Sequence, residues 1–398
     1  MRNQPAVVDA APSTGNAQLT LRTPVCDHPA LAIMPRGSEV LPSQLSLAGL
    51  RLMKALVIGP KNPDFDPGYN RAITDALKQV GYRASCLEFF VSTPPGFASR
   101  VKIDLARMAG IQTFYDEYVA AFNASVSTAC ETLRPDIVLV IRGSKIKAET
   151  LEKISALKIL WCHDVVRRCD LTLEQLRAYD RVYVFDRSDL HWLAERRLTG
   201  QFLPLGVDPR VYFPRSTRKD IDVFFVGAYY PDRRETLEFL ADSLPRRSLR
   251  FYGRHVKYRE PTTWTKYLAY RLKGQGSVFV NRSLNAHEIS QFYRRSKICI
   301  NMHHSQNQFG CNPRVFEIMA SGSFQICDNL AYVLDNFGSY VETYKDRWHL
   351  KDLILANLDD EEARESKAKA AEEFVFGNHT FKHRITDMLA DCEMPNRS

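Results

Sequence analysis

Apolar runs of strand length alternate with helical patterns along most of this 398-residue chain, and the alternation occurs in two successive series. The first series is KALVIG (54–59), ASCLEFF (84–90), DIVLVIRG (136–143), KILWCHD (158–164), RVYVFD (181–186) and QFLPLG (201–206). The second is DVFFVGA (222–228), LRFYG (249–253), SVFVNR (277–282), KICINMH (297–303), FQICDN (324–329) and SYVETY (339–344). Strands that alternate with helices form parallel sheets with helices on both faces. The sequence therefore predicts an α/β protein with two doubly wound parallel sheets.

Stretches without this alternation mark the predicted domain boundaries. Residues 1–52 show no period of 2 or 3.6 and are predicted to be a disordered tail. An interdomain linker is predicted at 207–220, where prolines and a run of charge break the pattern. We therefore expect Rossmann-like domains at 53–206 and 221–375, and at 376–398 a C-terminal helix that packs back on the body, followed by a tail.

Composition restricts the class of protein. Hydrophobic residues make up 45% of the chain and charged residues 25%, as in soluble globular proteins. We find neither an apolar run of membrane-helix length nor a secretion signal, and the nine cysteines lack CxxC spacing. These features predict a cytoplasmic protein with reduced thiols. The net charge of +8 fits an anionic ligand or surface.

The segment from Asn312 to Asp328 is predicted to form a short helix, a turn and a buried strand. One helix face is apolar, whereas Arg314 and Glu317 lie on the other face, which is predicted to be free to bind. Unpaired N–H groups at the helix start near Asn312, together with the Arg314 guanidinium, suit a diphosphate. Glu317 suits ribose hydroxyls, and Gly322 allows a sharp turn at positive φ.

Arg314 to Gly322, read as R-x-F-E-x-M-A-x-G before a hydrophobic strand, resembles the donor-binding helix of GT-B glycosyltransferases. The chain resembles most closely the spore-maturation CgeB-like glycosyltransferases (glycosyl transferases group 1-like). The same resemblance is carried by MKALVIGP (53–60), ILWCHD (159–164), LPLGVDPRVYFP (203–214) and NHTFKHR (378–384). It implies the GT-B fold, in which two Rossmann-like domains face a central cleft. It also implies a metal-independent hexosyl- or related transferase with no cofactor, whose donor is a UDP-, GDP- or dTDP-linked sugar.

The chain departs from this family pattern at one position. Many retaining transferases of this architecture carry two glutamates separated by seven residues, and Phe309 stands where the first glutamate would lie before Glu317. The stereochemical outcome therefore stays open, and Glu317 is predicted to bind the donor and not to act as a catalytic base.

Further donor-side candidates follow the strands of the second series. They are Gly227, Arg233, Arg234, Gly253, Asn301 and His303. Either arginine is placed to meet the donor phosphates, although two surface arginines at a solvated helix start fit the same pattern. His303 is placed to face the cleft, but a lone histidine at a strand end is also a common structural residue.

The catalytic candidates in the first domain are His163 and Asp164, which end an apolar strand and so emerge at the cleft. Asp164 is suited to deprotonate an acceptor hydroxyl or to orient His163, and capping of the next turn is the structural alternative. The acceptor-side candidates are Gly68, Tyr69, Arg142 and Asp186.

Residues 254–275 mix basic and aromatic side chains and exceed the minimal fold. Such a segment suits peripheral contact with the inner face of a membrane and a lipid-linked or cell-envelope acceptor, as in polysaccharide biosynthesis. An ordinary surface helix is the favoured interpretation of this segment, and no nucleic-acid-binding motif is present. For the whole chain, sugar transfer is the first hypothesis. A sugar-nucleotide epimerase and a catalytically inert structural protein with the same fold remain alternatives.

Overall fold

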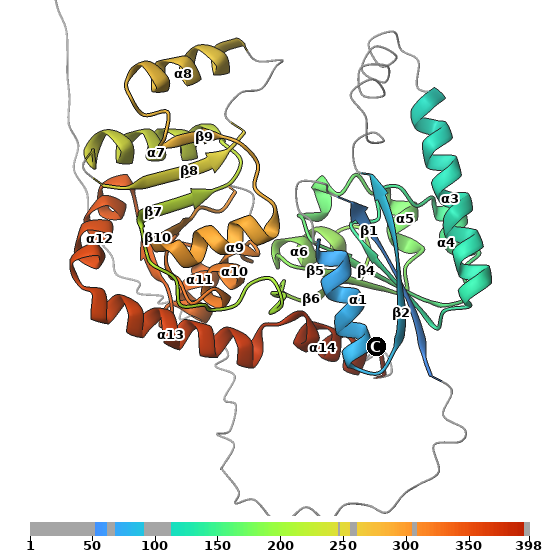
Figure 1. The fold of residues 1–398 in the computed structure, drawn as a ribbon. Coiled ribbons are helices and arrows are strands. Elements are labelled where there is room, and N and C mark those ends of the chain that lie inside the picture. The colour runs from blue at the N-terminus through green and yellow to red at the C-terminus, as the bar shows by residue number, and fades with distance from the viewer. Residues whose placement is uncertain are drawn as a thin grey trace, which may run out of the picture. The chain divides into compact units, whose positions relative to one another are not determined.

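The computed structural model describes residues 52–61, 68–90, 113–245, 247–254, 261–304 and 309–393. The predicted tail 1–52 lies outside these residues except for Leu52. The remainder, Arg51–Ser398, forms one compact unit that contains two parallel six-stranded sheets (Figure 1).

The first sheet has the strand order β2-β1-β3-β4-β5-β6, and all of its pairs are parallel. Its strands are β1 (Lys54–Lys61), β2 (Arg83–Phe90), β3 (Ile137–Ile141), β4 (Leu157–Cys162), β5 (Arg181–Val184) and β6 (Gln201–Phe202). The helical segments between them are α1 (Tyr69–Gln79), α3 (Thr113–Leu133), α4 (Ala148–Glu152), the 3₁₀ turn η2 (Val166–Arg168), α5 (Leu173–Arg177) and α6 (Ser188–Ala194).

The second sheet has the order β12-β11-β10-β7-β8-β9 and is also parallel throughout. Its strands are β7 (Ile221–Val226), β8 (Leu249–Gly253), β9 (Phe279–Asn281), β10 (Ser296–Asn301), β11 (Phe324–Asp328) and β12 (Glu342–Tyr344). The helices of this half are α7 (Pro231–Ser243), α8 (Pro261–Leu272), α9 (Ala286–Arg295), α10 (Arg314–Ala320), α11 (Ala331–Phe337), α12 (Arg347–Asp359), α13 (Glu361–Asn378) and α14 (Phe381–Glu393).

Every apolar run predicted as a strand contains one, which confirms the doubly wound α/β class. The strands read as continuous apolar runs because helices cover both faces of each sheet. In β3, for example, all five residues of IVLVI are buried. Among the described residues, no helix is long and apolar enough to cross a membrane.

Local signals in the sequence also hold in the structure. Gly81 follows α1 at φ +96°, and Gly322 turns from α10 toward β11 at φ +63°, so both glycines adopt the left-handed conformation. α9 begins with a capping box, in which the side chains of Asn285 and Glu288 each accept a hydrogen bond from the other's backbone N–H.

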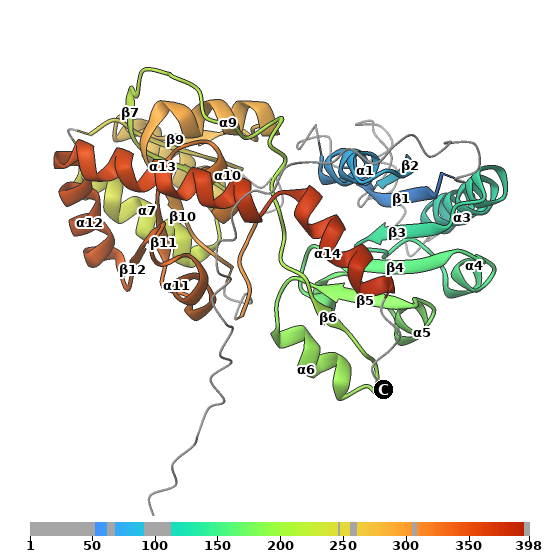
Figure 2. The ribbon, with the colours of Figure 1, turned by 90° about the horizontal axis from the view of Figure 1, so that it is seen from below.

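The C-terminal helices connect the two halves of the compact unit. α13 packs against α10, and α14 packs against α1 of the first domain (Figure 2). The segment predicted as a linker begins in a packed conformation, since Val207, Val211 and Tyr212 are buried. Val207 also forms a parallel bridge with Thr380, directly before α14. Two chain connections between the domains therefore run side by side at this point.

Candidate functional site

A cavity of about 660 Å³ lies where both sheets end in loops. Strand order reverses between β1 and β3 in the first sheet and between β7 and β10 in the second. Loops diverge at such switch points, which is where doubly wound folds bind ligands. The lining agrees with this rule, because Pro60 and Lys61 end β1, Arg142 follows β3, and Ala228 and His304 follow β7 and β10.

α10 places Arg314 and Glu317 at the cavity, as the sequence predicts. The prediction of unpaired N–H groups at the helix start is wrong, however, because these groups already donate hydrogen bonds to neighbouring residues of the chain. The Arg314 N–H donates to Asn312 Oδ1 at 3.1 Å, and the next N–H donates to the Asn312 carbonyl. The following two N–H groups, including that of Glu317, both donate to the Pro313 carbonyl. An anion at the start of α10 would therefore meet the Arg314 side chain and not unpaired helix N–H groups.

Glu317 links the two domains inside the cavity. It is only 5% exposed, and its Oε1 accepts a hydrogen bond of 2.9 Å from the Tyr69 hydroxyl of α1. Burial raises the pKa of the Glu317 carboxyl, while nearby Arg314 and the hydroxyls of Tyr69 and Tyr212 oppose that rise. Tyr69, which is predicted on the acceptor side, thus contacts Glu317, which is predicted on the donor side.

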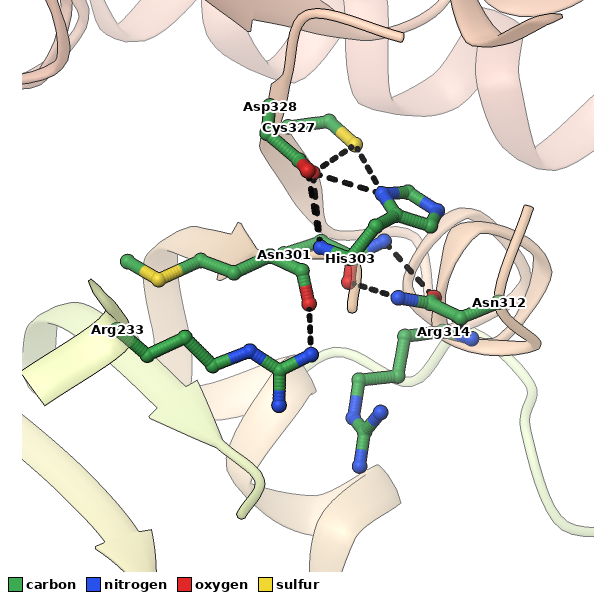
Figure 3. Close-up of polar contacts among 8 residues, drawn as sticks. Arg233, Asn301, His303, Asn312, Arg314, Cys327 and Asp328 are labelled. Atoms are coloured by element: carbon green, nitrogen blue, oxygen red, sulfur yellow. Dashed lines mark hydrogen bonds and ion pairs between the residues drawn. The ribbon is translucent and has the colours of Figure 1, made fainter. Parts of the chain in front are cut away.

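The cavity distinguishes the two candidate arginines at the start of α7. Arg233 lines it, and its guanidinium donates to the carbonyls of Ala228 at 3.1 Å and Met302 at 2.6 Å. Burial, with a smaller effect of nearby Arg314, lowers the pKa of Arg233 to about 10. Figure 3 shows the Arg233 and Arg314 side chains pointing to the same side. Arg234 is not among the residues that line the cavity.

Asn301 and His303 position the strand ends beside the cavity without lining it. Asn301 exchanges two amide hydrogen bonds with Asn312, which does line the cavity, at 2.9 and 3.1 Å. His303 bonds to the Asp328 carboxylate through its backbone N–H at 3.0 Å and its Nδ1 at 2.7 Å (Figure 3). These pairs join β10 to the start of α10 and to the end of β11.

His303, Cys327 and Asp328 also form a group whose potential metal-ligand atoms lie within 4.8 Å of one another. The Asp328 Oδ1 atom already contacts both the His303 ring and the Cys327 thiol, the latter at 3.4 Å. We assign this group a structural role in fixing the ends of β10 and β11.

None of the three glycines predicted on the donor side, Gly227, Gly253 and Gly322, lines the cavity, although Ala228, next to Gly227, does. Gly253 ends β8, where a Cβ atom would collide with the Gly227 carbonyl oxygen and crowd the Tyr229 ring. The close approach of the end of β8 to the residues after β7 therefore requires glycine at position 253.

His163 and Asp164 both line the cavity, as predicted for the end of β4. The His163 ring packs against Trp161 with ring centroids 4.4 Å apart, and among the described residues neither ring nitrogen has a hydrogen-bond partner. Burial lowers the pKa of His163 to about 3, so the imidazole is neutral near pH 7. Asp164 Oδ1 accepts the Val165 N–H at 3.0 Å and pairs with Arg168 at 3.5 Å, whereas the first N–H of η2, that of Val166, donates to Asp189.

Three of the four acceptor-side candidates line the cavity: Gly68, Tyr69 and Arg142. The fourth, Asp186, is fully buried away from the lining. Its carboxylate accepts the backbone N–H groups of Ser188 at 2.9 Å and Phe309 at 3.2 Å. Asp186 therefore ties the end of β5 to the segment before α10 and does not face an acceptor.

Several cavity residues escaped the sequence analysis, namely Arg168, Tyr212, Tyr230 and His304. Tyr212 lies in the segment interpreted as a linker. An aromatic residue between prolines was the available signal there, and the structure shows that it is buried. Arg168 lies four residues after Asp164, a spacing at which opposite charges pair in a helical turn.

The two sheets and their shared cavity define the GT-B fold, built from two Rossmann-like domains. Residues 233–390 match a family model described as glycosyl transferase-like, and this range contains Arg233, Arg314 and Glu317. No curated protein matches the chain.

Solved structures share the fold at low sequence identity. Sucrose-phosphate synthase from Thermosynechococcus elongatus is 11% identical with a TM-score of 0.57, and the match covers 85% of this chain and 99% of that one. HepE from Anabaena, in complex with UDP and glucose, is 14% identical with a TM-score of 0.58, covering 85% and 100%. Trehalose 6-phosphate synthase from Burkholderia multivorans is 12% identical with a TM-score of 0.52, covering 86% and 96%.

Proposed function

We propose that the protein is a glycosyltransferase of the CgeB-like type, which moves a hexosyl or related group from a nucleotide-sugar to an acceptor hydroxyl without a metal. The observation that carries this proposal is the convergence of Arg233, Arg314 and Glu317 on one cavity, at the switch point of the second sheet. The glycosyl transferase-like match covers all three residues.

Arg233 and Arg314 have the chemistry that a departing nucleoside diphosphate requires. During transfer the acceptor oxygen bonds to the anomeric carbon, the bond from that carbon to the diphosphate breaks, and negative charge grows on the leaving group. Fixed guanidinium groups stabilise that charge most strongly when water is excluded. Glu317, held by Tyr69, supplies the carboxylate for ribose hydroxyls. The complexes of HepE with UDP and UDP-glucose support a donor of this class.

The first domain supplies the acceptor side of the reaction. The proton of the acceptor hydroxyl passes either to Asp164, as an inverting mechanism requires, or to the departing diphosphate, as in retention without an enzyme nucleophile. With a pKa of about 3, His163 is a weak base, so we assign it the role of a hydrogen-bond partner for the acceptor. Its two unpartnered ring nitrogens are available for that role.

We further propose a cytoplasmic protein that contacts the membrane surface through α8. Trp264, Leu268 and Leu272 recur every fourth residue on this helix and are 55%, 56% and 80% exposed. Lys266 and Arg271 are exposed on the same helix, which carries no acidic residue. An apolar ridge beside basic side chains suits anionic headgroups. Retention on phosphatidylglycerol vesicles but not on phosphatidylcholine vesicles, abolished by Trp264→Ser with Leu268→Ser, is the expected result.

Nucleotide binding tests the central proposal. Thermal shift with UDP, GDP, dTDP and their sugar conjugates should show stabilisation by one nucleotide series, about 2.7 kcal/mol at a ligand concentration one hundred times Kd. Glu317→Gln, which keeps the side-chain shape, should reduce that stabilisation. Failure of every nucleotide to stabilise the wild-type protein would overturn the proposal. Turnover then separates the alternatives, because an epimerase interconverts donors, whereas a transferase releases a nucleoside diphosphate.

A further inference from the structure

A second pair of arginines lies in the same cavity but on the first domain. Arg142 directly follows β3, and Arg168 ends the η2 turn. The two are adjacent, since Arg142 Nη2 donates to the Arg168 carbonyl at 3.2 Å. Arg142 lies at the switch point of the first sheet, as Arg233 lies near that of the second. The cavity thus has one arginine pair on each sheet.

Arg142 has a positive charge that the described protein does not neutralise. None of the described carboxylates forms an ion pair with it, and its buried Nε atom has no hydrogen-bond partner. The four carboxylates at the cavity have other partners: Asp164 pairs with Arg168, Glu88 with Lys61 and Asp208 with Arg210, while Glu317 accepts a hydrogen bond from Tyr69. Arg142 is half-buried, and a partly desolvated guanidinium gains from a counter-charge, so an anion at this position would stabilise the site.

The backbone at Arg142 is also unusual. Its φ is +67°, a left-handed conformation that costs a non-glycine residue roughly 1–2 kcal/mol, and Gly143 follows with the same φ. Strain of this kind persists where the surrounding structure imposes it, and it concentrates at ligand sites. At Arg142 this strained conformation occurs in a residue that lines the cavity.

Uncharged hydrogen-bonding groups lie beside this positive charge. His163 lines the same cavity with both ring nitrogens unpartnered, and its low pKa keeps the imidazole neutral. His304 completes the lining between the domains, and burial together with Arg168 and Arg233 lowers its pKa. A ligand bound here therefore meets guanidinium groups for an anion and a neutral imidazole for a hydroxyl.

We propose that the acceptor is an anionic sugar or polyol, whose oxyanion, a phosphate or a carboxylate, is bound by Arg142 and Arg168. His163 hydrogen-bonds to a hydroxyl of the same acceptor. This inference rests on the proposed transferase function and names its acceptor class. Arginine suits both oxyanions because its planar fork donates two parallel hydrogen bonds. The Arg233 and Arg314 pair is then left for the donor diphosphate.

Calorimetry on the full chain tests this assignment, in the presence of a saturating concentration of the nucleoside diphosphate that stabilises the protein most. The probes are glucose 6-phosphate, glucuronate and glucose. We expect at least one anionic probe to bind at least tenfold more tightly than glucose. Arg142→Gln should weaken that anion at least tenfold and change nucleotide affinity by less than twofold, whereas Arg233→Gln should weaken the nucleotide. Arg168→Gln provides a second variant with the same expected pattern if Arg142→Gln does not fold.

The alternative results separate this inference from the function on which it rests. Binding of glucose as tight as that of both anions would refute the anionic acceptor and leave the transferase proposal intact. A loss of nucleotide affinity in Arg142→Gln equal to that in Arg233→Gln would assign all four arginines to the donor and also refute it. If no nucleotide binds the wild-type protein, the proposed function fails and the acceptor assignment fails with it.

Discussion

Replacement of Arg233 by glutamine provides the sharpest test of the donor side, because the chain contains a matched control in the next residue. Arg233 lines the cavity and donates to two main-chain carbonyls, those of Ala228 and Met302. Arg234 belongs to the same helix turn but does not line the cavity. The variants Arg233→Gln and Arg234→Gln therefore make the same change in side chain and net charge, at a cavity position and at a non-cavity position.

The structure sets the expected magnitude. Loss of one charge-assisted hydrogen bond to a phosphate costs roughly 1.5–3 kcal/mol, which is about a 10- to 150-fold increase in Kd. The same substitution leaves the buried Met302 carbonyl and the more exposed Ala228 carbonyl with at most one side-chain amide as donor, at a cost of about 1–3 kcal/mol of stability. Repulsion between Arg233 and Arg314 disappears in the variant and offsets part of this loss. Arg234→Gln should change nucleotide affinity by less than about twofold, since it breaks no contact with the cavity.

Isothermal titration of each variant with the best-binding nucleoside diphosphate measures the first effect, and thermal unfolding without ligand measures the second. Both should be recorded at pH 7.5, where the pKa of about 10 keeps Arg233 charged. An Arg233→Gln protein that binds nucleotide as tightly as the wild type would refute the reasoning. So would an Arg234→Gln protein that loses as much affinity as Arg233→Gln.

Further variants test stability and the charge states of the cavity. Tyr69→Phe removes the hydroxyl that donates a hydrogen bond of 2.9 Å to Glu317, so we expect the unfolding free energy to fall by about 1–3 kcal/mol. An unchanged denaturant midpoint would contradict this. Gly322→Ala should cost about 1–2 kcal/mol because φ is +63° and a Cβ would lie 3.1 Å from Pro214, whereas Gly377→Ala, in a helix with open space, should be neutral or stabilising. Since the folded pKa of His163 is about 3 and its ordinary value is 6.5, the unfolded chain binds its proton first, and stability falls as pH drops from 6.5 toward 3. Between pH 7.5 and pH 5.5, the unfolding free energy of His163→Gln should fall by roughly 1 kcal/mol less than that of the wild type. Denaturant titrations that show the same pH dependence for both proteins would count against a buried neutral imidazole.

The fold could be predicted from the sequence because its strands are buried on both faces. Such strands appear as uninterrupted apolar runs, and their order with intervening helices leaves few topologies. Turn glycines such as Gly81 and Gly322 were recognisable because few other residues adopt positive φ. The extent of each strand was less certain, and QFLPLG contributes only Gln201–Phe202 to the first sheet.

The candidate site was predicted less completely, because contacts between distant segments determine which strand ends open into a cavity. Arg314 and Glu317, which lie in a recognisable helix, and His163, which follows a recognisable strand, do line the cavity. It could not foresee that His303 would bond to Asp328, or that Asp186 would accept the N–H of Phe309. Those bonds join residues 25 and 123 positions apart, and no local pattern reports them.

The paired connections at Val207 and Thr380 have a mechanical consequence. Because the chain crosses between the domains twice at one place, rotation about that place is the least costly way to open the cavity. Tyr69 lies beside this hinge, since its ring centroid is 5.7 Å from that of Phe381, and its hydroxyl is bonded to Glu317 of the other domain. A donor bound at Glu317 would therefore contact both domains close to the axis of this rotation.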